Sequence, residues 1–249
     1  MKSGLVSISF RDLTPQQIIR AVKNARLQSI EWGGDVHVPA GNIAVAEQVG
    51  QQTREAGLEV AAYGSYYYVG CQNSAKDFEK VLASARALGA PLIRVWAYNQ
   101  SSGDVEDEAY HKFLQDALST AKKAAAFNIN IAYECHNNTL TDNYDFALKL
   151  MKDLDQPNVF MYWQPNQLRD EDYNQKAVRA LAPYITNVHV FQWDEKNRYK
   201  LAKGKLTWQR YLDSIRQDEK EHYCLLEFMP DDCVESLPDE AAVLLELLK

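Results

Sequence analysis

A regular alternation of short apolar segments with longer helical segments most constrains the fold of this chain. Eight apolar runs have the length and residue types of buried strands, at residues 5–10, 29–32, 58–63, 92–96, 129–134, 159–164, 185–189 and 224–227. Helical periodicity follows at residues 40–55, 76–88, 107–127, 144–154, 175–181, 207–215 and 241–248. Helix-start chemistry also opens a first helix, with Thr14 before Pro15 and Gln17, and the last one, with Ser236 before Leu237. A helical crossover returns the chain to the same end of a sheet, so the eight strands are expected to be parallel.

Eight strand–helix units in 249 residues predict a single α/β domain over residues 1–249, a parallel (β/α)8 barrel. No linker, change of composition or low-complexity tract interrupts the pattern. A doubly wound open sheet is the alternative, but it gathers its ligand groups at one switch point. Here polar residues end the second, fifth, sixth, seventh and eighth strand runs, which favours the barrel.

Composition excludes several classes of function. The net charge of −7 argues against a nucleic-acid partner, which usually meets a basic surface. No apolar run approaches the ~20 residues that a membrane span needs, and the first ten residues are too short and too rich in serine for a secretory signal. The four cysteines form no C-x-x-C pair and are expected to be reduced core thiols. We therefore expect a cytoplasmic protein without a membrane partner.

Four consecutive strand runs in the second half of the chain end on polar residues that can bind a metal. These residues are Glu134, Gln164, His189 and Glu227. A lone glutamate at a strand end is usually solvated, and a lone histidine is usually structural. The carboxyl ends of barrel strands converge on one mouth, however, so the four predictions are linked. Two carboxylates, an amide oxygen and an imidazole suit Mn²⁺, Mg²⁺ or Co²⁺, and Zn²⁺ is also compatible with this donor set.

Further polar and aromatic residues lie at or just after strand ends and are expected to line the same mouth as a substrate-binding rim. They are Glu31, Trp32, His37, Arg94, Trp96 and His136. Four of the five tryptophans fall at or just past strand ends, and tryptophan is well suited to stack on the C–H face of a sugar ring. The alternative for each tryptophan is ordinary core packing. Their shared placement favours a carbohydrate ligand.

The metal-binding candidates resemble those of a known family. Glu134, residue 164, His189 and Glu227 match the order Glu–Asp–His–Glu of the xylose-isomerase-like TIM barrels, which include sugar phosphate isomerases and epimerases, ketose 3-epimerases and endonuclease IV. This chain has Gln164 where the family usually has aspartate, so one negative charge is missing. Gln167 stands where several relatives have a substrate-binding histidine, and Arg198 is the nearest arginine to the basic residue that often follows the seventh strand.

The resemblance implies a metal-dependent sugar or sugar phosphate isomerase or epimerase with a small carbohydrate substrate. A metal held by Glu134 and Glu227 would polarise a carbonyl, and the two glutamates would move a proton at the neighbouring carbon. Two alternatives stay open: a non-catalytic sugar-binding barrel whose metal site is weakened by Gln164, and a retaining glycosidase that uses the same glutamates. The particular sugar, the choice between isomerisation and epimerisation, and whether the protein is a homo-oligomer also stay open.

Overall fold

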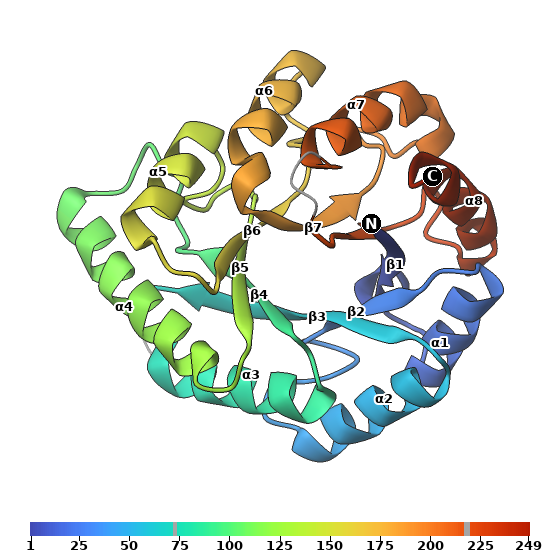
Figure 1. Ribbon diagram of the computed structural model, residues 1–249, viewed down its shortest axis with the longest axis horizontal. Helices are drawn as coiled ribbons and strands as arrows, with labels where there is room; N and C mark the ends of the chain where they lie inside the picture. Colours follow the sequence, from blue (N-terminus) through green and yellow to red (C-terminus); the bar gives the residue numbers. More distant parts are fainter. Residues whose placement is uncertain (72–73, 217–219) are drawn as a thin grey trace.

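The computed structural model describes residues 1–71, 74–216 and 220–249, and it is a closed (β/α)8 barrel (Figure 1). The parallel strands pair in chain order, and β8 pairs with β1 to close the ring. The strands are β1 (Lys2–Val6), β2 (Ser29–Gly33), β3 (Glu59–Val69), β4 (Leu92–Ala97), β5 (Asn130–Glu134), β6 (Val159–Trp163), β7 (Ile185–Val190) and β8 (Tyr223–Leu226). The predicted fold class is confirmed.

The helices form an outer ring around the strands (Figure 1). In the described residues they are α1 (Pro15–Asn24), α2 (Ile43–Glu55), α3 (Ser74–Leu88), α4 (Asp107–Ala125), α5 (Tyr144–Leu154), α6 (Glu171–Leu181), α7 (Lys205–Ile215) and α8 (Leu237–Leu247). None of them is long and apolar enough to span a bilayer.

The helix-start predictions meet different outcomes at the two ends of the chain. Thr14 forms the expected capping box, because its hydroxyl accepts from the N–H of Gln17 and the Gln17 side chain accepts from the N–H of Thr14. Ser236 makes no capping bond, since its hydroxyl donates to Asp231 Oδ2 at 2.7 Å. Helix α8 still begins at Leu237.

The first strand lies earlier than its apolar run predicted. Residues 7–10 form a short 3₁₀ helix (Ser7–Phe10), and β1 begins at Lys2 instead. The Ser7 hydroxyl accepts a hydrogen bond from the N–H of Gly33 at 2.9 Å, which ties the turn after β1 to the end of β2. Ile8 and Phe10 are buried within this turn, so their apolar pattern reflects burial rather than strand pairing.

Apolar packing is divided between two layers. The larger one lies between the strands and the helices and contains fully buried tryptophans such as Trp32, Trp163 and Trp208. The smaller one fills the inside of the barrel and includes Ala61, Ala132 and other inward-facing residues. Outward-facing strand residues therefore build the main core, and the charged strand-end residues lie at the carboxyl-terminal mouth.

Strand β3 is the longest strand of the barrel. It runs for 11 residues, and its last part pairs with β4 through Tyr68 opposite Trp96 and Val69 opposite Ala97. This extension brings Tyr66 and Tyr68 into ring contact with Trp96, at centroid distances of 5.4 and 4.7 Å. One side of the mouth thus carries an aromatic wall formed by these three residues.

Candidate active site

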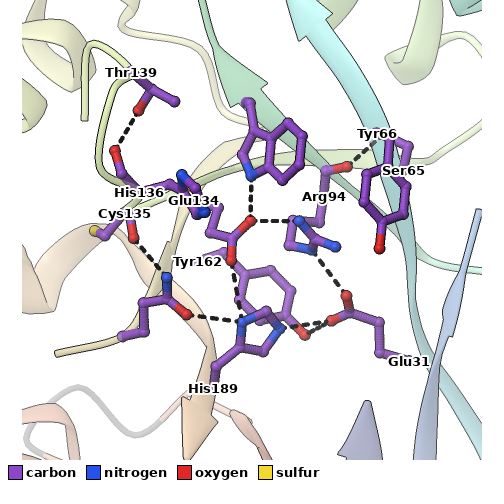
Figure 2. Close-up of polar contacts among 12 residues, drawn as sticks. Glu31, Ser65, Tyr66, Arg94, Glu134, Cys135, His136, Thr139, Tyr162 and His189 are labelled. Atoms are coloured by element: carbon purple, nitrogen blue, oxygen red, sulfur yellow. Dashed lines mark hydrogen bonds and ion pairs between the residues drawn. The ribbon is translucent and has the colours of Figure 1, made fainter. Parts of the chain in front are cut away.

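A buried cluster of charged side chains fills the carboxyl-terminal mouth of the barrel (Figure 2). Glu31 comes from β2, Arg94 from β4, Glu134 from β5 and His189 from β7, and Glu227 directly follows β8. None of the five is more than 7% exposed. Ionised groups are buried in this way only when they are paired with one another or with a ligand.

Arg94 joins the two sides of this cluster (Figure 2). Its Nε donates to Glu31 Oε1 at 2.9 Å, and its Nη1 donates to Glu134 Oε2. Trp96 Nε1 donates to the same oxygen of Glu134. One oxygen of Glu134 is therefore held by two donors from β4.

His189 is surrounded by oxygen atoms. Its Nδ1 lies 3.2 Å from Gln164 Oε1, 3.3 Å from Glu134 Oε1 and 3.6 Å from Glu227 Oε2. Its Nε2 lies 3.1 Å from Glu31 Oε2. Burial lowers the pKa of His189, but the carboxylates of Glu227 and Glu31 outweigh this effect and raise the pKa to about 10.

The three carboxylates have different electrostatic surroundings. Burial raises the pKa of Glu31, but Arg94 and His189 more than offset it and bring the pKa down to about 2. Burial likewise acts to raise the pKa of Glu134, and the charges of Arg94 and His189 hold it well below its usual range. The pKa of Glu227 is raised by burial and by the neighbouring charge of Glu134, against the opposing effect of His189.

Glu134, His189 and Glu227 have the geometry of a metal-binding group. Each offers one ligand atom, and these atoms lie within 4.8 Å of one another. Bonds of about 2.0–2.6 Å to a divalent ion can be made from donors at this separation, whereas a gap above about 8 Å would have prevented it. Gln164 directs its Oε1 at the same place, because its Nε2 donates to the carbonyl of Cys135 at 2.9 Å. These donors fit an oxygen-rich cation site.

Four of the predicted rim residues lie at the mouth. Trp96 contacts Glu134 through its ring nitrogen, and its ring lies 5.1 Å from the ring of His136. Glu31 and Arg94 are also there, but they face each other and the cluster rather than an open pocket.

The predictions for Trp32 and His37 are wrong. Trp32 is fully buried in the outer core, and its Nε1 donates to Thr53 of α2 at 3.1 Å. Strand alternation explains this position, because the neighbouring Glu31 points inward and Trp32 must then point toward the helices. Both ring nitrogens of His37 are engaged, with Ser7 Oγ at 3.0 Å and the carbonyl of Leu13 at 3.1 Å.

Gln167 and Arg198 lie on loops beside the cluster. Gln167 lines a cavity of about 320 Å³, which is also bordered by His136 and Gln164. Arg198 pairs with Asp232, and its guanidinium lies 5.0 Å from the Trp193 ring centroid. Both side chains are within the loop region of the carboxyl-terminal face.

Two polar residues of the cluster were missed from the sequence. The Tyr162 hydroxyl donates to Glu31 Oε2, and Asn187 Nδ2 donates to the Tyr162 oxygen at 3.3 Å. Tyr162 stands two residues before Gln164, so strand alternation places both on the inner face. That signal was present in the sequence, but the aromatic side chain resembled core filler.

Comparison with known proteins gives consistent matches along the chain. A model of the xylose isomerase-like TIM barrel matches residues 19–249. The 3-dehydroshikimate dehydratase of Bacillus anthracis is 22% identical over 280 residues, which cover 98% of this chain and 96% of that protein.

Solved structures share the architecture. The probable 3-DHS dehydratase of Bacillus anthracis has a TM-score of 0.83 at 19% identity, with 98% of this chain and 99% of that chain covered. The 3-keto-D-glucoside 4-epimerase of E. coli has a TM-score of 0.80 at 18% identity, with 99% of each chain covered. The D-psicose 3-epimerase of Clostridium cellulolyticum H10, with D-tagatose, has a TM-score of 0.77 at 14% identity, with 100% of this chain and 98% of that chain covered.

Proposed function

The chain belongs to the xylose isomerase-like TIM barrel family, and we propose that it is a divalent-metal-dependent enzyme that moves a proton at the carbon beside a carbonyl group of a sugar-like substrate. Isomerisation and epimerisation of a sugar or sugar phosphate both belong to this reaction class. The observation that carries the proposal is the convergence of Glu134, His189 and Glu227, whose ligand atoms lie within 4.8 Å of one another.

The residues that would hold the cation are Glu134, His189 and Glu227, with the amide oxygen of Gln164 as a neutral fourth donor. A bound divalent cation would polarise the substrate carbonyl and stabilise the negative charge that develops on its oxygen. The remaining chemistry falls to the protein: binding the substrate ring or chain, and moving the proton.

The contacts favour Glu227 as the group that removes the proton. Glu134 is held by Arg94 and Trp96 at one oxygen and faces His189 with the other. Among the described residues, Glu227 makes an ion-pair contact only with His189, at 3.6 Å, and accepts no hydrogen bond. A less constrained carboxylate, which is also the most exposed of the five charged residues of the cluster, is better placed to reach a substrate carbon.

The aromatic wall of Tyr66, Tyr68 and Trp96 supports a sugar-like substrate, because aromatic rings pack well against the C–H faces of such molecules. The names of two similar proteins point to the same chemistry. A 3-keto-D-glucoside 4-epimerase and a D-psicose 3-epimerase both act at a carbon next to a ketone.

A dehydratase is the second candidate function. The match to 3-dehydroshikimate dehydratase over nearly the whole of both chains favours it. Loss of water from a β-hydroxy ketone starts with removal of a proton beside the carbonyl, so the same cluster would serve. The products distinguish the two: a dehydratase gives a conjugated product with new ultraviolet absorption, whereas an isomerase or epimerase does not.

The test is solvent isotope incorporation. The purified protein is stripped with EDTA, reloaded with Mn²⁺, Mg²⁺ or Co²⁺, and incubated in D₂O with ketoses, 3-keto-glycosides and 3-dehydroshikimate. We expect deuterium at the carbon beside the carbonyl, or a dehydrated product, only with metal present. Glu227→Gln should abolish this activity, and Glu108→Gln, on the exposed face of α4, should not.

The proposal falls if the native protein binds no divalent metal at millimolar concentration and exchanges no substrate proton. A sugar-binding barrel would then be the better account, and binding of the same sugars without turnover would identify it.

A further inference from the structure

We propose that Arg94 is a positioning residue: paired with Glu31 in the space that Gly64 leaves open, it occupies one carboxylate oxygen of Glu134 and leaves the other, which faces His189, to bind a cation. The inference rests on the proposed function, because it concerns how the cluster presents Glu134 to a cation and a substrate.

The first observation is the fixed position of Arg94. Its Nε donates to Glu31 Oε1, and Glu31 is itself held at its other oxygen by the Tyr162 hydroxyl and by His189 Nε2. The side chains of Arg94 and Glu31 are only 3% and 0% exposed. The guanidinium therefore cannot turn away from the cluster without leaving Glu31 Oε1 without its partner in the interior.

The second observation is the space at Gly64, on β3 between the strands that carry Glu31 and Arg94. A Cβ atom added at Gly64 would lie 2.3 Å from Glu31 Oε1 and 3.0 Å from Arg94 Nη2. The first distance is shorter than real Cβ atoms show, so the ion pair occupies the volume that any other residue would need. Glycine at position 64 therefore leaves the space in which Glu31 and Arg94 pair.

The fixed position of Arg94 determines which carboxylate oxygen of Glu134 is available. Its Oε2 is taken by Arg94 Nη1 and Trp96 Nε1, and its Oε1 faces His189 Nδ1 at 3.3 Å. Arg94 therefore restricts the carboxylate to one oxygen and adds a fixed positive charge beside the metal donors. Both effects oppose tight cation binding while they keep the remaining oxygen correctly aimed.

The test uses Arg94→Met, which keeps side-chain length and removes the charge. Mn²⁺ binding is measured by calorimetry and by the spin-resonance signal of the free ion, and folding by circular dichroism. We expect Mn²⁺ to bind about tenfold more tightly or better, because a positive charge beside the site has been removed. We expect kcat to fall at least about 100-fold, with a smaller change in KM, because Glu134 is no longer oriented. A merely structural role would weaken Mn²⁺ binding together with stability.

Gly64→Ala supplies a second probe that changes no charged group. It should shift Mn²⁺ affinity and kcat in the same directions as Arg94→Met, by a smaller factor. Gly103→Ala is the matched control, since a Cβ there meets nothing within 4 Å, and it should leave both quantities unchanged.

The inference is overturned if folded Arg94→Met binds Mn²⁺ equally or more weakly, or if Gly64→Ala behaves like Gly103→Ala. If the native protein binds no divalent cation and exchanges no substrate proton, while Arg94→Met binds Mn²⁺, the positioning role stands and the proposed function falls. If neither binds the ion, both fall.

Discussion

Glu134 and Glu227 should contribute very differently to stability, although both lie in the same buried cluster. At an effective dielectric constant of 20, the contact of Glu227 with His189 at 3.6 Å corresponds to an attraction of about 4.6 kcal/mol. The repulsion between Glu227 and Glu134, whose donor atoms lie within 4.8 Å, is at least about 3.5 kcal/mol on the same basis. These effects nearly cancel, and burial further disfavours the charge of Glu227. Glu227→Gln should therefore change the free energy of unfolding by no more than about 1 kcal/mol.

Glu134 experiences the same repulsion from Glu227, but it has two cationic neighbours, His189 and Arg94, so the attraction exceeds the repulsion. It lies 3.3 Å from His189 and accepts hydrogen bonds from Arg94 and Trp96. Breaking a buried ion pair by removing one partner costs about 3–5 kcal/mol. Arg94 keeps its contact with Glu31, so Glu134→Gln should lie at the lower end, about 3 kcal/mol.

Thermal unfolding in EDTA, followed by circular dichroism, measures both changes. For a chain of this size each kcal/mol shifts Tm by about 2–4 °C, so Glu134→Gln should unfold about 6–12 °C below the native protein. Glu227→Gln should stay within about 4 °C of it. Both variants should lose turnover. If Glu227→Gln lowers Tm as much as Glu134→Gln does, the charge balance argued from these distances is refuted.

Two further predictions separate residues that the sequence alone groups together. Trp32→Phe should lower Tm by several degrees and leave kcat unchanged, because it removes core volume and the hydrogen bond to Thr53. Trp96→Phe should lower kcat about tenfold with little change in Tm, because it removes a hydrogen-bond donor to Glu134. If Trp32→Phe lowered kcat and Trp96→Phe lowered Tm, Trp32 would be the site residue and Trp96 the core residue. Gln164→Asp should tighten Mn²⁺ binding measured by calorimetry, because it adds a negative charge to the donor set, and unchanged or weaker binding would exclude position 164 from that set.

The fold was predictable because burial and helix periodicity repeat through the whole chain. There are two exceptions. The third strand was predicted to end at residue 63 but continues to Val69, and in the first strand run Ile8 and Phe10 are buried without being paired in the barrel. An apolar run indicates burial, and burial alone does not distinguish a strand from a buried 3₁₀ turn.

The site was predictable only at the level of strand ends. Glu134, His189 and Glu227 were expected to converge because a polar residue that closes a buried strand needs a partner, and their ligand atoms do lie within 4.8 Å of one another. Trp32 was misplaced because proximity to a strand end was weighed above the alternation that turns it away from the mouth.

The contact between Glu31 and Arg94 could not be predicted from sequence. The two residues lie 63 positions apart on β2 and β4, and they meet across Gly64 of the intervening strand. Their contact depends on the register of three strands, in which Gly64 stands opposite Arg94 and Glu31 stands opposite Ala62. The alternation of strands and helices predicts the strand order, but which residues stand opposite each other on neighbouring strands is set by side-chain packing.

Two features of this chain act on the proposed cation site in the same direction. Gln164 supplies a neutral oxygen where the related sequence pattern has a carboxylate, and Arg94 places a positive charge beside Glu134. Each reduces the negative charge available to hold a divalent cation, so affinity should be lower than in a site with three free carboxylates. The same reduction leaves more of the cation's charge to act on a substrate carbonyl. The balanced charges of Glu31, Arg94, Glu134 and His189 also let the barrel mouth fold around buried ions that satisfy one another, so that stability need not depend on the metal.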